Sequence, residues 1–134
     1  MRKKILLGIL AAAVICGVFA LTFQSSEGTV RLSETVRKAL ESIGWKMESH
    51  ALRSNIHIVM YFVLGITIAL FGRSMGWKPW MTILIGCGIG LLDETVKVLL
   101  PGREFELVDL IKDCVGVVLG NSVWLFNRDP DEPD

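Results

Sequence analysis

The chain has 134 residues, of which 51% are hydrophobic, and its mean hydropathy is +0.51. This length allows one domain, and the apolar share exceeds what a soluble core of that size normally needs, so we expect an integral membrane protein. Because 14 basic residues balance 14 acidic ones, the chain has no basic field for nucleic acid and no acidic field for cationic partners.

Hydropathy predicts an all-α fold, a membrane bundle of four transmembrane helices. The expected spans are residues 5–23, 56–71, 80–100 and 108–126. Each is close to the ~17–25 residues that cross a hydrocarbon core as a helix. The third and fourth spans contain charged residues, which must face other helices or water because bare charges are costly in lipid. We assign residues 1–126 to one membrane domain.

The basic residues Arg2, Lys3 and Lys4 precede the first span and should stay on the cytoplasmic side of the membrane. Four crossings then place both termini in the cytoplasm. The same start also fits a secretory signal with Ala20 as the last residue before cleavage. We expect the first span to be retained, with cleavage as the alternative.

The segments between and after the spans have their own patterns. In the first loop, Leu32, Val36 and Ile43 belong to an apolar series at helical spacing, which predicts an amphipathic helix on the outer membrane surface. A loop helix packed on the spans is the alternative. The short link from Gly72 to Pro79 predicts antiparallel second and third spans. The acidic, proline-containing tail, residues 127–134, is predicted to be disordered.

Polar side chains gather where the four spans should meet near one face of the membrane. With four crossings, the end of the first span, the start of the second, the end of the third and the start of the fourth share one side, expected to be the outer one. We predict a polar pocket there, with a purely structural ion-pair network as the alternative. The predicted ligand-binding residues are Ser25, Ser26, Arg53, His57, Tyr61, Asp93, Glu94, Lys97, Arg103, Asp109 and Asp113.

Helical spacing sharpens this prediction. Arg53, His57 and Tyr61 follow one another at four-residue steps and therefore share one helix face. Gly116 and Gly120 form a pair of small residues at the same spacing, which predicts the close approach of another helix. We therefore expect the helices to pack closely toward the cytoplasmic side and to form a polar region toward the outer side.

Several motifs occur in a distinctive order along most of the chain. They are Phe23-Gln24-Ser25-Ser26 with Ser33 downstream, then Arg53, His57, Tyr61, Leu64 and Gly65, then Asp93-Glu94, then Pro101-Gly102-Arg103, and finally Asp109, Gly116 and Gly120. Together they resemble the VanZ-like family of small bacterial membrane proteins, some of which are associated with resistance to teicoplanin-type glycopeptide antibiotics. The resemblance implies a multi-pass protein of the bacterial plasma membrane with a role in the cell envelope.

Two positions depart from the family pattern. The family usually has a glutamine three residues after the position of Glu94 and an asparagine four residues after that of Asp109, where this chain has Lys97 and Asp113. Our hypothesis is that Lys97 and Asp113 face each other, so that an ion pair replaces an amide pair. The departure leaves open whether antibiotic resistance transfers to this chain.

The predicted function is binding at the envelope, without a defined reaction. The pocket would bind a lipid head group, a lipid-linked wall precursor or a glycopeptide, and membrane lipids are the expected surroundings. The expected anion contacts are Arg53, Arg103 and Lys97. The expected orienting groups are His57, Glu94 and Asp109.

Two other functions stay open. In a membrane enzyme, His57 and Glu94 would be the catalytic residues, performing acid–base chemistry on a phosphate-linked lipid, although no strong catalytic motif supports this. A small transporter or assembly subunit could use the same charges to gate ions. No cofactor and no metal are predicted, although a metal held by His57, Glu94 and Asp109 is geometrically conceivable.

Overall fold

The computed structural model describes residues 2–23, 34–39, 41–44, 49–102 and 104–126, without the side chains of 49–55 and 125–126. Every regular element in this part of the chain is a helix, which confirms the all-α prediction. The named helices are α1 (Arg2–Thr22), α3 (Ser49–Ser74), α4 (Pro79–Lys97), α5 (Leu107–Asn121) and α6 (Val123–Phe126).

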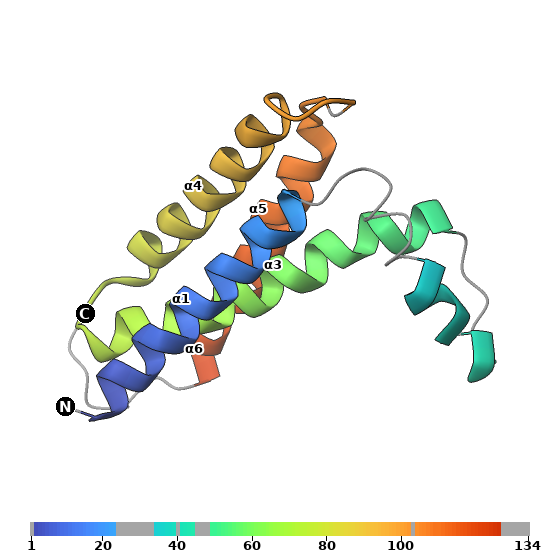
Figure 1. Ribbon diagram of the computed structural model, residues 1–134. Helices are drawn as coiled ribbons and strands as arrows, with labels where there is room; N and C mark the ends of the chain where they lie inside the picture. The colour runs from blue at the N-terminus through green and yellow to red at the C-terminus, as the bar shows by residue number, and fades with distance from the viewer. Residues whose placement is uncertain (1, 24–33, 40, 45–48, 103, 127–134) are drawn as a thin grey trace.

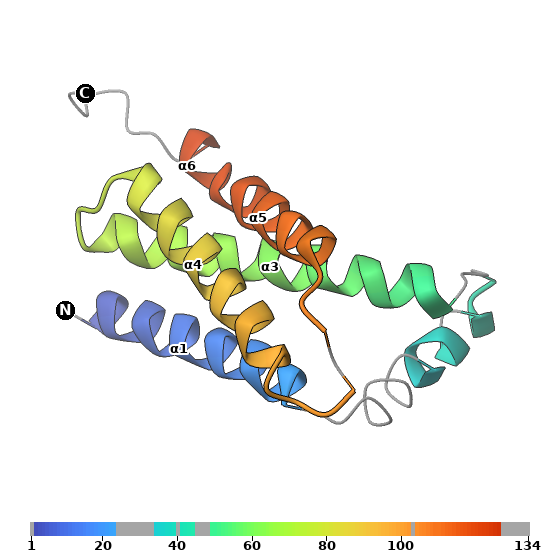
Figure 2. The same ribbon diagram turned by 90° about the horizontal axis from the view of Figure 1, so that it is seen from above.

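The long helix α3 is the centre of the bundle, because it packs against α1, α4 and α5 (Figure 1). The link between α3 and α4 is tight: the Trp77 amide donates a hydrogen bond to the Gly72 carbonyl oxygen over 2.9 Å, and Gly76 has φ +77°. Glycine reaches this left-handed conformation without a Cβ penalty. The turn makes α3 and α4 antiparallel neighbours, as predicted (Figure 2).

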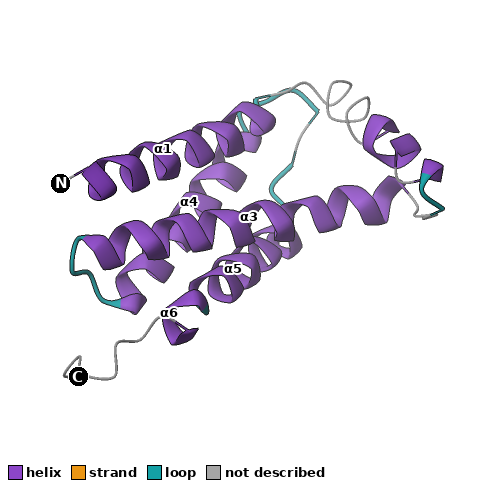
Figure 3. Ribbon diagram, turned by 90° about the horizontal axis from the view of Figure 1, so that it is seen from below, coloured by secondary structure: helices purple, strands orange, loops and turns teal. Residues whose placement is uncertain are grey.

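The bundle has two distinct ends. The start of α1, the link between α3 and α4, and α6 lie at one end, whereas the last turns of α1 and α4 and the first turn of α5 lie at the other (Figures 2 and 3). The second end is where the sequence predicted that polar residues would meet.

Glycine residues let α3 and α5 pack with their backbones almost in contact. A Cβ atom added at Gly116 would lie 2.7 Å from the Ile58 carbonyl oxygen, and one added at Gly65 would lie 2.6 Å from the Val117 carbonyl oxygen. Both distances are too short for a real side chain. The predicted close approach at Gly116 is therefore confirmed, and we call the contact at Gly65, Gly116 and Gly120 the glycine seam.

Within the part of the chain that the structure describes, two helical stretches are long and apolar enough to cross a membrane: Arg2–Thr22, which is α1, and Ile56–Met75, which includes most of α3. The other two predicted spans are less clear, because α4 carries ionisable residues in its last turns and α5 has only 15 residues. All four long helices nevertheless expose large apolar side chains, for example Leu6, Leu84 and Val118. Such a surface is typical of a protein surrounded by lipid.

The helix boundaries differ from the predicted spans in two places. First, α3 begins at Ser49, seven positions before the apolar run that marks the second span, because polar residues extend the helix beyond its apolar part. Second, the predicted fourth span is divided into α5 and α6 at Ser122. There the Asn121 side chain donates a hydrogen bond back to the Val117 carbonyl oxygen over 3.0 Å.

In the first loop, residues 34–39 and 41–42 are helical, in agreement with the predicted loop helix. This segment lies beyond the start of α3 and away from α1, α4 and α5 (Figure 1). Of its apolar side chains, Val36 is half-buried and Ile43, in the turn that follows, is exposed. The interfacial position stays a prediction, and Leu32 and the tail 127–134 lie outside the described residues.

Candidate functional site

Five ionisable side chains from three helices meet inside the bundle. His57 comes from α3, Asp93, Glu94 and Lys97 come from the last turns of α4, and Asp113 comes from α5. All except His57 are buried, and Glu94 and Asp113 are each 0% exposed. We call these five residues the polar cluster.

Lys97 is the positively charged partner of the carboxylates on its own helix. Its ammonium group donates a hydrogen bond to Glu94 and lies 3.6 Å from Asp93 Oδ2. Two further donors fix these carboxylates: the Thr22 hydroxyl at the end of α1 bonds to Asp93, and the Glu106 backbone amide bonds to Glu94 Oε2 over 3.3 Å. The end of α1 and the start of α5 are thereby tied to α4.

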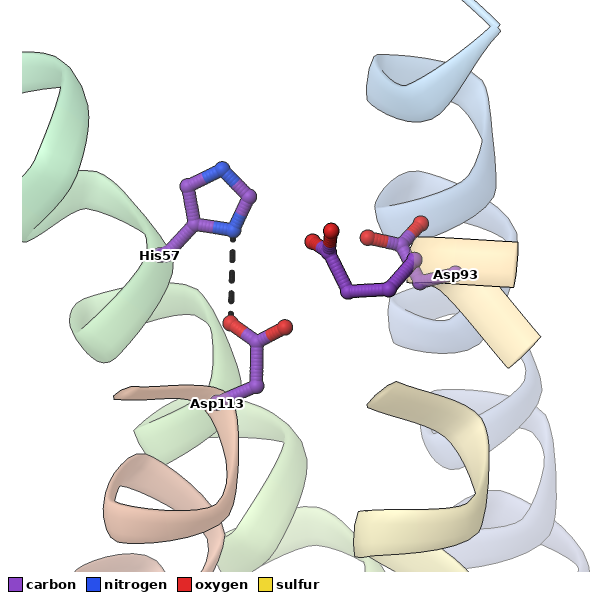
Figure 4. Close-up of side chains that lie close together, drawn as sticks. His57, Asp93 and Asp113 are labelled. Atoms are coloured by element: carbon purple, nitrogen blue, oxygen red, sulfur yellow. Dashed lines mark hydrogen bonds and ion pairs between the residues drawn. The ribbon is translucent and has the colours of Figure 1, made fainter. Parts of the chain in front are cut away.

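His57 and Asp113 form a second pair across the interface between α3 and α5. His57 Nδ1 lies 3.3 Å from Asp113 Oδ1, and Asp93 faces this pair from the opposite side (Figure 4). Asp113 Oδ2 is buried and has no hydrogen-bond partner among the described residues. Since buried polar atoms are nearly always paired, this oxygen marks an incomplete set of contacts.

The polar cluster carries more negative than positive charge. It contains three carboxylates and one ammonium group, so with the carboxylates ionised its charge is negative whether His57 is neutral or protonated. Uncompensated charge inside an apolar bundle is costly. The arrangement is chemically suited to hold a positively charged or hydrogen-bond-donating partner.

The predicted ion pair between Lys97 and Asp113 is wrong. Lys97 contacts Glu94 and Asp93, and Asp113 contacts His57 instead. The reason is local: Lys97 has carboxylates three and four residues earlier on the same helix face, and such neighbours meet without any adjustment between helices.

Other predicted site residues lie at the edge of the cluster or outside the described part. Asp109 pairs with Lys112 over 3.4 Å in a partly exposed position. Tyr61 is buried next to Gly90 and Gly116, close to Asp113. The residues whose side chains lie outside the described set are Ser25, Ser26, Arg53 and Arg103.

Two polar features of the structure were not predicted from the sequence. Thr22, which holds Asp93, could have been found because it directly precedes the motif that begins at Phe23. Thr82 and Asn121 form a buried pair between α4 and α5, with 2.6 Å between the hydroxyl and Asn121 Oδ1. An asparagine within an apolar run was the available signal for this second contact.

Comparison with known proteins gives one match. No curated protein and no solved structure is significantly similar to this chain. A family model described as VanZ/LLP1 matches residues 6–128, which include nearly all of the helical bundle. The resemblance inferred from the order of the motifs is thereby confirmed, and the chain belongs to the VanZ/LLP1 family.

Proposed function

We propose that the chain crosses the bacterial plasma membrane four times, with both termini in the cytoplasm and the polar cluster beneath the outer face. The support is the distribution of side chains: large apolar residues are exposed on all four long helices, while Asp93, Glu94 and Asp113 are buried. This arrangement fits lipid outside and polar contacts between the helices. Family membership and the two long apolar helices support a membrane protein in the same way.

We infer that the polar cluster binds the polar part of an envelope molecule, which is a lipid head group, a lipid-linked wall precursor or a glycopeptide antibiotic. The observation that carries this proposal is the incomplete pairing of Asp113 inside a cluster with excess negative charge. A closed structural network would satisfy every buried oxygen. In this proposal the ligand, or an ion that binds with it, supplies the missing positive charge.

The contacts of Lys97 and Asp109 favour a different division of roles within this proposal. Lys97 was expected to contact an anion, but its ammonium group already binds Glu94 and Asp93. Asp109 was expected to orient the ligand, but it pairs with Lys112 outside the cluster. Among the described residues, His57 and Asp113 are therefore the groups that we expect to contact the ligand.

The test is to identify what copurifies with the protein. Wild-type chain extracted in mild detergent should enrich one class of lipid or wall precursor, and Glu94→Gln should reduce that enrichment when equal amounts of purified protein are compared. Glu104→Gln is the matched control, because Glu104 is an exposed glutamate on the link before α5. If wild type and Glu94→Gln copurify with the same lipids or wall precursors in equal amounts, the proposal is contradicted.

The biological side of the proposal has its own measurement. If the chain contributes to glycopeptide resistance, a susceptible bacterium expressing it should tolerate teicoplanin-type antibiotics better, and His57→Gln should abolish the gain at normal expression. If His57→Gln instead abolishes the gain only by lowering the amount of protein, His57 has a structural role.

A further inference from the structure

We propose that His57, Asp93, Glu94 and Asp113 form a binding site for one divalent transition-metal ion. Each residue offers one donor atom, and the four atoms lie within 4.8 Å of one another. Donor atoms held ~2.1 Å from one ion are at most about 4.2 Å apart, so closing the group around an ion requires side-chain shifts below about 1 Å. The donors come from α3, α4 and α5, and the bundle brings them together before any ligand is present.

A second observation points to an occupant. Asp113 is 0% exposed, and its Oδ2 atom has no hydrogen-bond partner among the described residues. Figure 4 shows that this oxygen points away from the His57 contact, on the side where Asp93 lies. A buried carboxylate oxygen that points into a group of donor atoms is positioned to bind a metal ion.

Charge supports a dication in particular. With neutral His57, the three carboxylates and the Lys97 ammonium group leave two uncompensated negative charges. One divalent ion would offset both of them. Protonation of His57 would offset only one of them, and the ammonium group of Lys97 is already included in this balance.

The donor set also indicates the class of metal. Three carboxylate oxygens with one imidazole nitrogen suit Mn²⁺, Fe²⁺ or Zn²⁺, whereas Mg²⁺ and Ca²⁺ prefer oxygen alone and Cu⁺ prefers sulfur. The surrounding hydrogen bonds fit this role, because Thr22 orients Asp93 and the Glu106 amide orients Glu94. Such contacts hold metal-binding carboxylates in place. The set differs from the one conceivable from sequence, since Asp93 and Asp113 take the place of Asp109.

The experiment measures metal binding to the full chain. Protein purified in detergent is stripped with a chelator, incubated with Mn²⁺ or Zn²⁺ alone and desalted, and the bound metal is measured by mass spectrometry. We expect about one ion per wild-type chain, and affinity lower by at least about tenfold in Asp113→Asn and Asp93→Asn. Asparagine keeps the size of the side chain, so these variants should retain the wild-type elution profile.

The matched control is Asp109→Asn, which removes a carboxylate from the same helix as Asp113, one turn earlier. Asp109 pairs with Lys112 and is not among the four donors, so this variant should bind metal like wild type. Absence of bound metal in wild type, or equal loss in Asp109→Asn and Asp113→Asn, overturns the proposal. The measurement uses no envelope ligand, so its outcome is independent of the copurification test of the proposed function.

Discussion

Lys97 controls the charge balance inside the bundle. Its ammonium group contacts Glu94 and Asp93, and all three side chains are buried. Removing one partner of a buried ion pair costs more than the pair contributes, because the remaining charge has no water to solvate it. Lys97 should therefore matter far more for stability than a lysine on the surface of the bundle.

We expect Lys97→Met to lower the free energy of unfolding by about 3–5 kcal/mol, because two buried carboxylates lose their cation. Lys97→Gln should recover part of this loss, since an amide can still donate a hydrogen bond to Glu94. The control is Lys112→Met, which removes the partly exposed pair with Asp109 and should cost at most about 1 kcal/mol. Thermal unfolding in detergent measures all three, and equal effects of the two methionine variants would contradict the argument.

At the level of residues, the sequence predicted which groups lie near one another but not which of them pair. Four-residue spacing and the short link between α3 and α4 are enough to bring His57, Glu94 and Asp113 to one end of the bundle. The partner of Lys97 depends on how each helix is rotated about its own axis, and hydropathy carries no information about this rotation. The carboxylates three and four positions before Lys97 were the available signal.

Between elements, the glycine seam determines how closely α3 and α5 approach. The same interface carries His57 on α3 and Asp113 on α5, and the pair is 3.3 Å apart. Any side chain that separates the two backbones must also lengthen this contact. The seam therefore supports both the packing of the bundle and the geometry of the polar cluster.

We expect Gly116→Ala to lower the free energy of unfolding by about 1–3 kcal/mol, because the added methyl group overlaps the Ile58 carbonyl oxygen. Gly88→Ala is the control within α4, where an added Cβ meets nothing within 4 Å. Alanine favours a helix interior more than glycine does. The free energy of unfolding of Gly88→Ala should therefore equal that of wild type or exceed it by up to about 1 kcal/mol. Comparable losses in both variants would show that close packing at Gly116 is not the cause.

For the helices themselves, the sequence predicted their existence and neighbours better than their ends. Apolar runs located all four long helices, and the link at Gly72–Pro79 correctly predicted an antiparallel pair. The start of α3 and the division at Ser122 were missed. Helix ends depend on local hydrogen bonds, such as the one from Asn121 to Val117, which hydropathy does not represent.

For the whole molecule, the outer surface of the long helices differs from that of a soluble protein. The interior holds charged groups such as Glu94 and Asp113, whereas the outer surface of the long helices presents leucine, isoleucine and valine. A lipid solvent makes this arrangement favourable. The four-span topology follows as a proposal from that surface and from the two ends of the bundle.

We expect a reporter enzyme that is active only outside the cell to be active when fused after Phe23 or after Leu100, and inactive when fused after Met75. Phe23 and Leu100 follow the ends of α1 and α4, which lie at the end of the bundle that holds the polar cluster, whereas Met75 follows the end of α3 at the opposite end (Figure 2). Fusions after Phe23 and Leu100 that report opposite sides would refute the four-span arrangement.

The length of α3 has a consequence for access to the polar cluster. A helix of 26 residues is about 39 Å long, whereas the hydrocarbon core is about 30 Å thick. In the proposed topology, the first two turns of α3 therefore stand among the head groups, and His57 lies just below them. Its side chain is 24% exposed, while those of the other cluster members are nearly enclosed. Among the members of the polar cluster, His57 is therefore the one whose side chain reaches toward the head-group layer in this topology.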